Sequence, residues 1–155
     1  MRKGERISRF VQTLEGGGGK SGAVAQNPFY RAFFHCWNEQ QYYEAHDVLE
    51  HLWLETTSED ADYFKGLIQA AGAFVHLKKQ FEHPTHPKHS RRLGPAVRLF
   101  RLAEKNLSAA ASTRHGFNVA KFREMLEHYA RAIIESDHQK NPWSPQRAPK
   151  LELKL

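Results

Sequence analysis

The densest group of side chains that could do chemistry lies in one short segment, EAHDVLEHLW, at residues 44–53. On a helix with 100° per residue, the apolar stripe of this segment centres on Ala45 and Leu49. His46 and Glu50 lie four residues apart at the border of that stripe, so their side chains are neighbours. An i, i+4 His/Glu pair can chelate one metal ion or hold a charge-assisted hydrogen bond that tunes the imidazole. The sequence therefore offers this pair as metal ligands or as an acid–base pair.

Two polar side chains in a later, largely apolar segment could complete such a site. Gln69 and His76 are the neutral polar side chains inside a helix predicted at 58–80, and their spacing of seven residues puts them on one face. If this helix pairs in antiparallel fashion with the helix predicted at 41–55, Gln69 comes level with His46. Unpaired polar groups there would cost about 1–3 kcal/mol each, so we expect them to contact one another. Both a buried hydrogen-bond network and the floor of a ligand pocket would satisfy them.

Other candidate residues point less strongly to chemistry. His83, His86 and His89 recur in a proline-rich loop, and a solvated loop explains them better than a metal site does. A ferritin-type di-metal centre needs two Glu-x-x-His pairs on bundle helices, whereas only Glu135 begins such a pair here. Cys36 lies among aromatic residues on an apolar helix, which predicts inert packing.

The glycine-rich segment GGGGKSG at 16–22 has some letters of a phosphate-binding loop but not its spacing. That motif requires a glycine six residues before its lysine, and counting back from Lys20 reaches Leu14. A helix must also follow directly, whereas residues 21–28 predict a loop. We therefore predict a flexible hinge at 16–22.

The elements that must position these residues are helices. Apolar residues at helical spacing predict five of them, beginning at about Pro28 and then covering about 41–55, 58–80, 90–111 and 118–137. Asn27 before Pro28 predicts the cap of the first helix, Thr57 with Asp60 predicts a capping box, and Asn118 predicts the last cap. No segment predicts a convincing β-hairpin. The fold class is all-α, a single-domain bundle of about five helices.

Two extensions flank the predicted bundle. We divide the chain into an N-terminal arm at 1–27 with its glycine-rich hinge, a bundle at 28–140, and an extended proline-containing tail at 141–155 that packs back on the bundle. The arm has apolar residues at helical spacing, and the first bundle helix has more aromatic surface than one groove covers. The arm is therefore expected to cover this surface, on the same chain or across a homodimer. The arm residues concerned are Ile7, Phe10, Val11 and Leu14.

Charge and cysteine content limit the function classes. The 155 residues carry a net charge of +6, with seven acids and one base at 28–60 but six bases and one acid at 83–105. Aromatic residues are not interleaved with the basic run, so we expect only weak, non-specific contact with nucleic acid. We expect the acidic and basic segments to attract each other. The single cysteine and the lack of a long apolar run predict a cytoplasmic protein with no membrane span.

Two segments together resemble a known family. YYEAHDVLEHLW at 42–53 and YFKGLIQAAGAFVH at 63–76 resemble the DUF309 family of small helical proteins of unknown function, and the resemblance extends over about 29–110. It implies an all-helical bundle and no particular activity. The His/Pro linker at 82–90 departs from the family pattern. That pattern falls on Gly66 and on the side chains that we take as the candidate polar pocket: Glu44, His46, Asp47, Glu50, Trp53, Gln69 and His76.

The sequence supports two hypotheses of different classes. The first is a cytoplasmic helical-bundle protein whose His/Glu/Gln pocket binds a metal ion or a small molecule. If it is an enzyme, His46 would be the general base or a metal ligand and Glu50 its partner, although a divalent metal is not required. The second is a non-catalytic module that binds protein or nucleic acid through the basic helix predicted at 90–111. The two differ in whether His46 and Glu50 open to a cavity or are sealed under Trp53.

Overall fold

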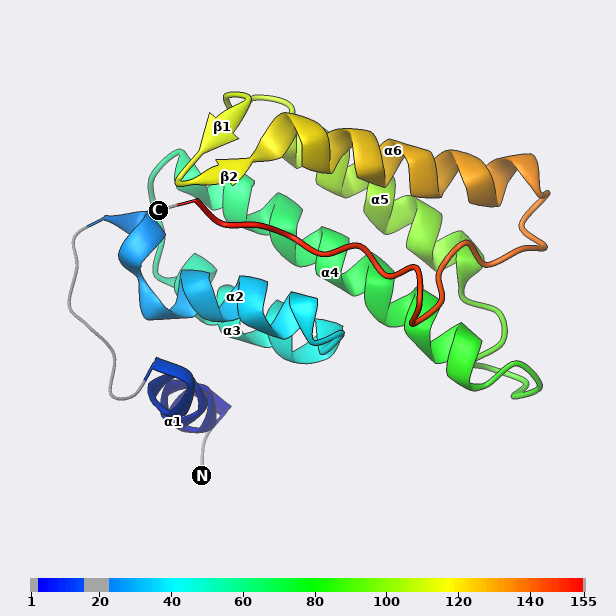
Figure 1. Ribbon diagram of the computed structural model, residues 1–155, viewed down its shortest axis with the longest axis horizontal. Coiled ribbons are helices and arrows are strands. Elements are labelled where there is room, and N and C mark those ends of the chain that lie inside the picture. Colours follow the sequence, from blue (N-terminus) through cyan, green and yellow to red (C-terminus); the bar gives the residue numbers. More distant parts are fainter. Residues whose placement is uncertain (1–2, 16–22, 155) are drawn as a thin grey trace.

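The computed structural model describes residues 3–15 and 23–154 (Figure 1). Within residues 28–140 five α-helices form a bundle, which confirms the all-α prediction. The central helix α4 packs between α3 and α5, while α2 packs on α3 and α6 packs on α5. The elements in chain order are α1 (Lys3–Glu15), the 3₁₀ helix η1 (Val24–Gln26), α2 (Pro28–Asn38), α3 (Tyr42–Leu54), α4 (Asp60–Glu82), α5 (Leu93–Leu107), β1 (Thr113–Arg114), β2 (Phe117–Asn118) and α6 (Val119–Glu135).

Two of the three predicted helix caps are present. The Asn27 side-chain oxygen accepts the backbone N–H groups of Phe29 and Tyr30 at 2.8 and 3.3 Å, with Pro28 at the first helical position. Asn118 accepts the N–H of the third residue of α6 at 3.0 Å. These short side chains satisfy helix N–H groups that have no partner within the helix.

The predicted capping box of Thr57 and Asp60 is wrong. The Ser58 hydroxyl instead accepts the backbone N–H of Asp60 at 3.2 Å, and α4 begins at Asp60. The Asp60 carboxylate accepts hydrogen bonds from Arg114 and His115, which come from a distant part of the chain. Because the carboxylate accepts from these distant donors, it does not take part in a capping box at the start of α4.

The core is aromatic and centred on α4. Trp37 lies fully buried, and its ring meets Phe74 edge to face with centroids 4.7 Å apart. Cys36 beside it is also fully buried, and this burial together with the Glu44 charge raises the pKa of the thiol to about 12. Cys36 is therefore a neutral packing residue at physiological pH. A Cβ at Gly66 would lie 2.7 Å from Leu107, so the glycine allows α4 and α5 to approach closely.

A small β-hairpin that the sequence analysis did not predict connects α5 to α6. Arg114 pairs with Phe117 in the antiparallel ladder of β1 and β2. The two turn residues between them, His115 and Gly116, have φ angles of +47° and +77°. Positive φ at both central residues is the geometry of a two-residue type I′ turn, which matches the twist of paired strands.

The C-terminal segment crosses the bundle in an extended path over α4 (Figure 1). Trp143 is only 1% exposed, and its indole N–H donates to the Tyr42 hydroxyl at 3.1 Å. The Trp37 indole N–H donates to the carbonyl of Pro149 at 2.9 Å. Asn38 both donates to and accepts from the backbone of Leu151, at 2.8 and 2.7 Å. The segment is therefore held along its length by specific hydrogen bonds.

The N-terminal helix α1 docks on α2 and α3, at the edge of the bundle (Figure 1). Its buried residues are Ile7 and Val11, which are 9% and 2% exposed, while Phe10 is partly buried against the core. These arm residues therefore lie on one helix, as their spacing predicted, and that helix packs on its own chain. Leu14 and the hinge predicted at 16–22 lie outside the part whose side chains the structure describes.

The surface of α5 is basic, as the sequence indicates. Arg98 and Arg101 are exposed, and Arg101 forms ion pairs with Glu104 and with Glu127 of α6. This arginine therefore finds its partner on α6 rather than in the acidic segment 28–60. In the described part of the chain, none of the helices combines the length and the apolar character that crossing a bilayer requires.

Candidate functional site

His46 lies on α3 between two carboxylates. Its Nδ1 is 3.1 Å from Asp47 Oδ1, and its Nε2 is 3.8 Å from Glu50 Oε2. The ring of Tyr43 stacks against the imidazole with centroids 6.3 Å apart. The side chains of His46 and Glu50 are 32% and 30% exposed, so the pair meets at the border of the buried stripe and is not sealed under Trp53. The arrangement suits a solvent-facing polar contact.

Gln69 and His76 contact the α5 side of the molecule. Gln69 accepts a hydrogen bond from Asn106 of α5 at 2.6 Å. His76 Nδ1 lies 3.0 Å from a guanidinium nitrogen of Arg92, just before α5. Burial, together with the positive charge of Arg92, lowers the pKa of His76 to about 4. A neutral imidazole can accept the Arg92 hydrogen bond, so His76 serves as an acceptor at neutral pH.

The polar side chains of α4 are thus not directed to the α3 pair as the antiparallel model predicted. α4 packs against α3 on one side and against α5 on the other, so either neighbour can satisfy a polar group on it. The contacts of Gln69 and His76 lie with the second neighbour, while His46 and Glu50 contact each other on α3. The structure therefore divides the candidate pocket into two separate sets of contacts.

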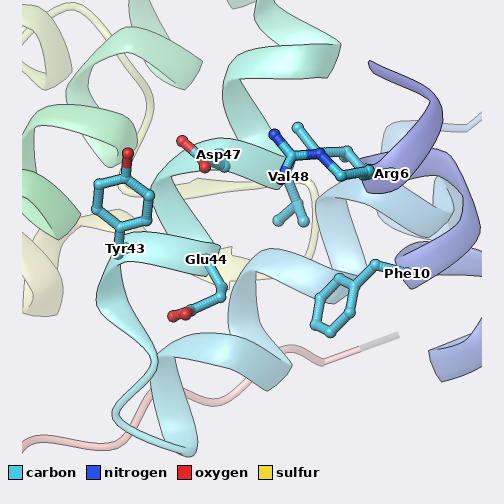
Figure 2. Close-up of a pocket in the computed structure, with 7 residues that line it drawn as sticks. Arg6, Phe10, Tyr43, Glu44, Asp47 and Val48 are labelled. Atoms are coloured by element: carbon cyan, nitrogen blue, oxygen red, sulfur yellow. The ribbon is translucent and has the colours of Figure 1, made fainter. Parts of the chain in front are cut away.

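Two acidic residues of α3, Glu44 and Asp47, line a groove between α3 and α1 (Figure 2). We call this the α1–α3 groove; it encloses about 350 Å³. Arg6 and Phe10 of α1 face Tyr43, Glu44 and Asp47 of α3 across it. Ile7 and Val48 complete its lining.

The α1–α3 groove combines charges of both signs with apolar walls. Glu44 is exposed at its rim, whereas Asp47 is half-buried. His51, one turn further along α3, is half-buried too, because Phe29 stacks on its ring at 4.5 Å and Gly4 of α1 lies close by. The α1 helix therefore covers part of the polar side of α3.

A metal centre finds no support in the described residues. Nowhere in residues 3–15 and 23–154 do three or more His, Cys, Asp or Glu side chains gather in a way that could hold a metal ion. The His86 ring stacks on His89 with centroids 4.4 Å apart, yet its Nδ1 accepts the backbone N–H groups of Lys88 and His89 at 3.0 Å. This imidazole therefore stabilises a turn of its own loop.

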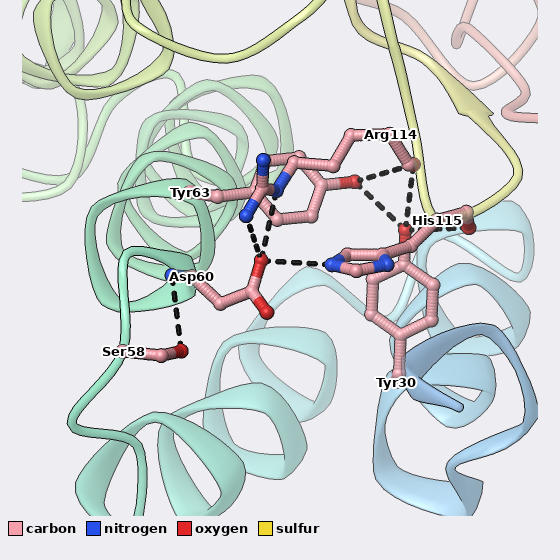
Figure 3. Close-up of polar contacts among 6 residues, drawn as sticks. All are labelled: Tyr30, Ser58, Asp60, Tyr63, Arg114 and His115. Carbon is pink, nitrogen blue, oxygen red and sulfur yellow. Dashed lines mark hydrogen bonds and ion pairs between the residues drawn. The ribbon is translucent and has the colours of Figure 1, made fainter. Parts of the chain in front are cut away.

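A second polar cluster, which the sequence analysis did not predict, joins α4 to the hairpin (Figure 3). One oxygen of Asp60 accepts from Arg114 Nε at 2.8 Å and from His115 Nε2 at 2.7 Å. Beside them, the hydroxyl groups of Tyr30 and Tyr63 lie 2.7 Å apart, and Tyr30 donates to the His115 carbonyl at 3.1 Å. The turn dipeptide His115-Gly116 was the one local indication of this hairpin.

The electrostatics of this cluster indicate a structural clamp. Burial opposes ionisation of Asp60, but the hydrogen bonds from His115 and Arg114 outweigh it and hold the pKa of this carboxyl below its usual value. Burial raises the pKa of both Tyr30 and Tyr63, so both remain neutral phenols. An acid that is ionised at neutral pH accepts from two side chains of the hairpin, and beside it two neutral phenols are in contact, so the cluster ties the hairpin to α2 and α4.

Comparison with known proteins supports the family resemblance. Residues 30–84 match the family model described as a domain of unknown function, DUF309. The match runs from α2 to just past the end of α4 and so includes the whole acidic segment of α3. No curated protein and no solved structure matches the chain. Both α1 and the C-terminal segment lie outside the matched residues.

Proposed function

We propose that this protein is a binding module whose site is the acidic face of α3, formed by Glu44 and Asp47, and whose ligand is a basic amphipathic helix. The observation that carries the proposal is the docking of α1 on this side of the bundle, with Ile7 and Val11 buried against α2 and α3. In this chain α1 occupies the site that a partner helix would take.

Charge complementarity supports this choice of ligand. α3 contains three acids and no lysine or arginine, whereas α1 contributes Arg6 to the α1–α3 groove opposite Glu44 and Asp47. An amphipathic helix that lays apolar anchors into a groove and carries basic residues at its rim is a common mode of recognition. The family match covers the α3 face but not α1, so the receiving surface lies in the matched part of the chain.

The proposal can be tested on the full-length chain. Substituting Ile7→Asp and Val11→Asp should release α1, because buried carboxylates at these positions are costly. A labelled peptide of residues 1–15 should then bind this double variant at least tenfold more tightly than the native chain, in which the tethered α1 competes. Adding Glu44→Gln and Asp47→Asn should weaken the peptide again. A peptide that itself carries both aspartates is the matched control.

Two results would contradict the proposal. One is equal, weak binding of the peptide to the native chain and to the double variant. The other is peptide binding that the two α3 substitutions leave unchanged, since the acidic face would then not be the receptor. Anisotropy of the labelled peptide at low and moderate salt measures both.

A second candidate function is small-molecule binding in the α1–α3 groove. Its support is an open groove of about 350 Å³ with two carboxylates and the Tyr43 ring. These groups suit an organic ammonium ion, which pairs with a carboxylate and stacks on an aromatic face. Phenethylamine should bind more tightly than 3-phenylpropionate, as followed by the NMR signals of α3, and Glu44→Gln should remove the preference.

The remaining expectations about metal, location and assembly stay predictions. His46 and Glu50 would supply two ligands to a metal ion, so a zinc titration of the untagged chain and of His46→Ala would test a metal role. The cytoplasmic location rests on the single cysteine. A homodimer would form if α1 docked on the α3 face of a second copy, and light scattering after gel filtration would detect it.

A further inference from the structure

A second cavity lies far along the chain from the α3 face. It encloses about 490 Å³ between the β-hairpin, the first turns of α6 and the C-terminal segment. We call it the hairpin–tail pocket. Its size falls in the range of small-molecule sites, which commonly measure about 300–1,000 Å³.

The walls of the hairpin–tail pocket are fixed by backbone contacts. The Lys154 N–H donates to the Gly116 carbonyl at 2.7 Å, and Leu153 forms a β-bridge with Phe117. Further back along the same wall, Leu151 is held by Asn38 on both its N–H and its carbonyl. The tail is therefore fixed in place as one wall of the pocket, and the pocket is formed in advance of any ligand.

The floor of the pocket is apolar. Phe117 and Phe122 line it and are only 3% and 2% exposed, and Met125 lies one turn further along α6. Over these buried rings, the half-buried side chains of Met125, Pro149 and Leu151 offer apolar surface on which a ligand can pack. A hydrophobic portion of a ligand would therefore be stabilised here.

The rim of the pocket is positively charged. Lys121, Lys150 and Lys154 line it, against the single acid Glu152. The three lysines come from α6 and from the tail, so the hairpin–tail contacts bring them to one opening. The first turn of α6 also lines the pocket, and the positive end of its helix dipole adds to the lysine charges.

We propose that the hairpin–tail pocket binds an amphipathic anion, a small molecule with an apolar body and a carboxylate or phosphate group. The apolar body packs on Met125, Pro149 and Leu151, and the anionic group pairs with the rim lysines. This site is independent of the α3 face, because it shares no residue with the α1–α3 groove.

Three small-molecule probes that share one alkyl chain and differ in their head group test the proposal on the full-length protein. Decanoate should bind in calorimetry, while decyltrimethylammonium and 1-decanol should bind at least tenfold more weakly. The triple variant Lys121→Gln, Lys150→Gln, Lys154→Gln should lose about tenfold in decanoate affinity. The matched control, Lys65→Gln with Lys105→Gln and Lys140→Gln, removes the same charge elsewhere and should bind as the native chain does.

A second variant separates the pocket from general surface charge. Met125→Trp should block decanoate by filling the floor, with the melting transition followed to confirm the fold. Decanoate binding that is unaffected by Met125→Trp would overturn the proposal. So would equal loss in the rim and control variants, or equal affinity for the anionic and cationic probes.

Discussion

At the scale of single residues, the charged groups of this protein are stabilised in two different ways. Asp60 is 15% exposed and accepts from both Arg114 and His115, whereas His46 is 32% exposed and lies between Asp47 and Glu50. A partly buried acid with two charge-assisted donors contributes more to stability than a pair at the surface, which is typically worth under about 1 kcal/mol. The clamp at Asp60 therefore matters more for the fold than the contacts of His46 on α3 do.

We expect Asp60→Asn to lower the free energy of unfolding by about 1–3 kcal/mol at neutral pH, because its donors lose a charged acceptor. The folded-state pKa of Asp60 lies below its usual value, so its stabilisation is complete above about pH 4 and is lost as the pH falls through the lowered pKa. Urea denaturation at pH 7 and at pH 3 measures both effects. Asp62→Asn, an exposed acid on the same helix, should change little; equal effects of the two would contradict the clamp.

His76 should make the protein acid-sensitive in a higher pH range. Its folded-state pKa is about 4, against about 6.5 for a free imidazole, so between these values the unfolded chain binds more protons. Stability should therefore fall as the pH drops from about 6.5 to 4, by roughly 1–2 kcal/mol after allowing for solvent screening. His76→Gln should flatten this slope, while His35→Gln, which removes an exposed imidazole, should leave it intact. An unchanged slope in His76→Gln would refute the assignment.

The sequence predicted the contact of His46 with Glu50 because that contact depends only on helical periodicity. It did not predict the partners of Gln69 and His76, because a helix buried between two neighbours offers its polar groups to either. The Asp60 cluster could not be predicted from the sequence for another reason. Its donors, Arg114 and His115, lie more than fifty residues away, and local patterns carry no information about such contacts.

At the scale of elements, helix type was easier to predict than helix ends. The third helix of the bundle was expected at 58–80 and runs Asp60–Glu82, whereas the fourth was expected at 90–111 and runs Leu93–Leu107. The helix begins later than predicted, and the Arg92 N–H just before it donates to the Gln80 side chain of α4. The hairpin escaped prediction because each strand has only two residues, too few for an alternating pattern to show.

We expect Gly116→Ala to weaken the contact between the hairpin and the tail. An added Cβ would lie 2.3 Å from the Lys154 carbonyl oxygen, and the φ of +77° is strained for any residue with a side chain. The cost should be about 1–3 kcal/mol, with faster amide exchange at Lys154. Gly94→Ala in α5 is the control: its φ is not positive and an added Cβ would meet Arg98 at 3.9 Å, so it should change stability less than Gly116→Ala does. Loss of stability in both variants alike would contradict this account.

At the scale of the whole molecule, the two ends of the chain have different roles. The tail fills the core with Trp143 and hydrogen-bonds to α2 through Trp37 and Asn38. The N-terminal α1 instead adds two buried side chains, Ile7 and Val11, at the edge of the bundle. The tail is therefore a structural part of the bundle, whereas we expect the bundle to tolerate the release of α1.

The role of the tail leads to the prediction that Trp143→Ala destabilises the whole bundle. Trp143 is 1% exposed and donates to Tyr42, so its removal leaves a large cavity and an unpaired hydroxyl. The expected loss is about 3–5 kcal/mol, a large share of the 5–15 kcal/mol typical of a domain. Trp143→Phe keeps most of the packing and should lose less, and Trp53→Ala, at a half-buried position, should also lose less. Urea denaturation followed by circular dichroism ranks the three, and a loss below about 1 kcal/mol for Trp143→Ala would show that the tail only rests on the bundle.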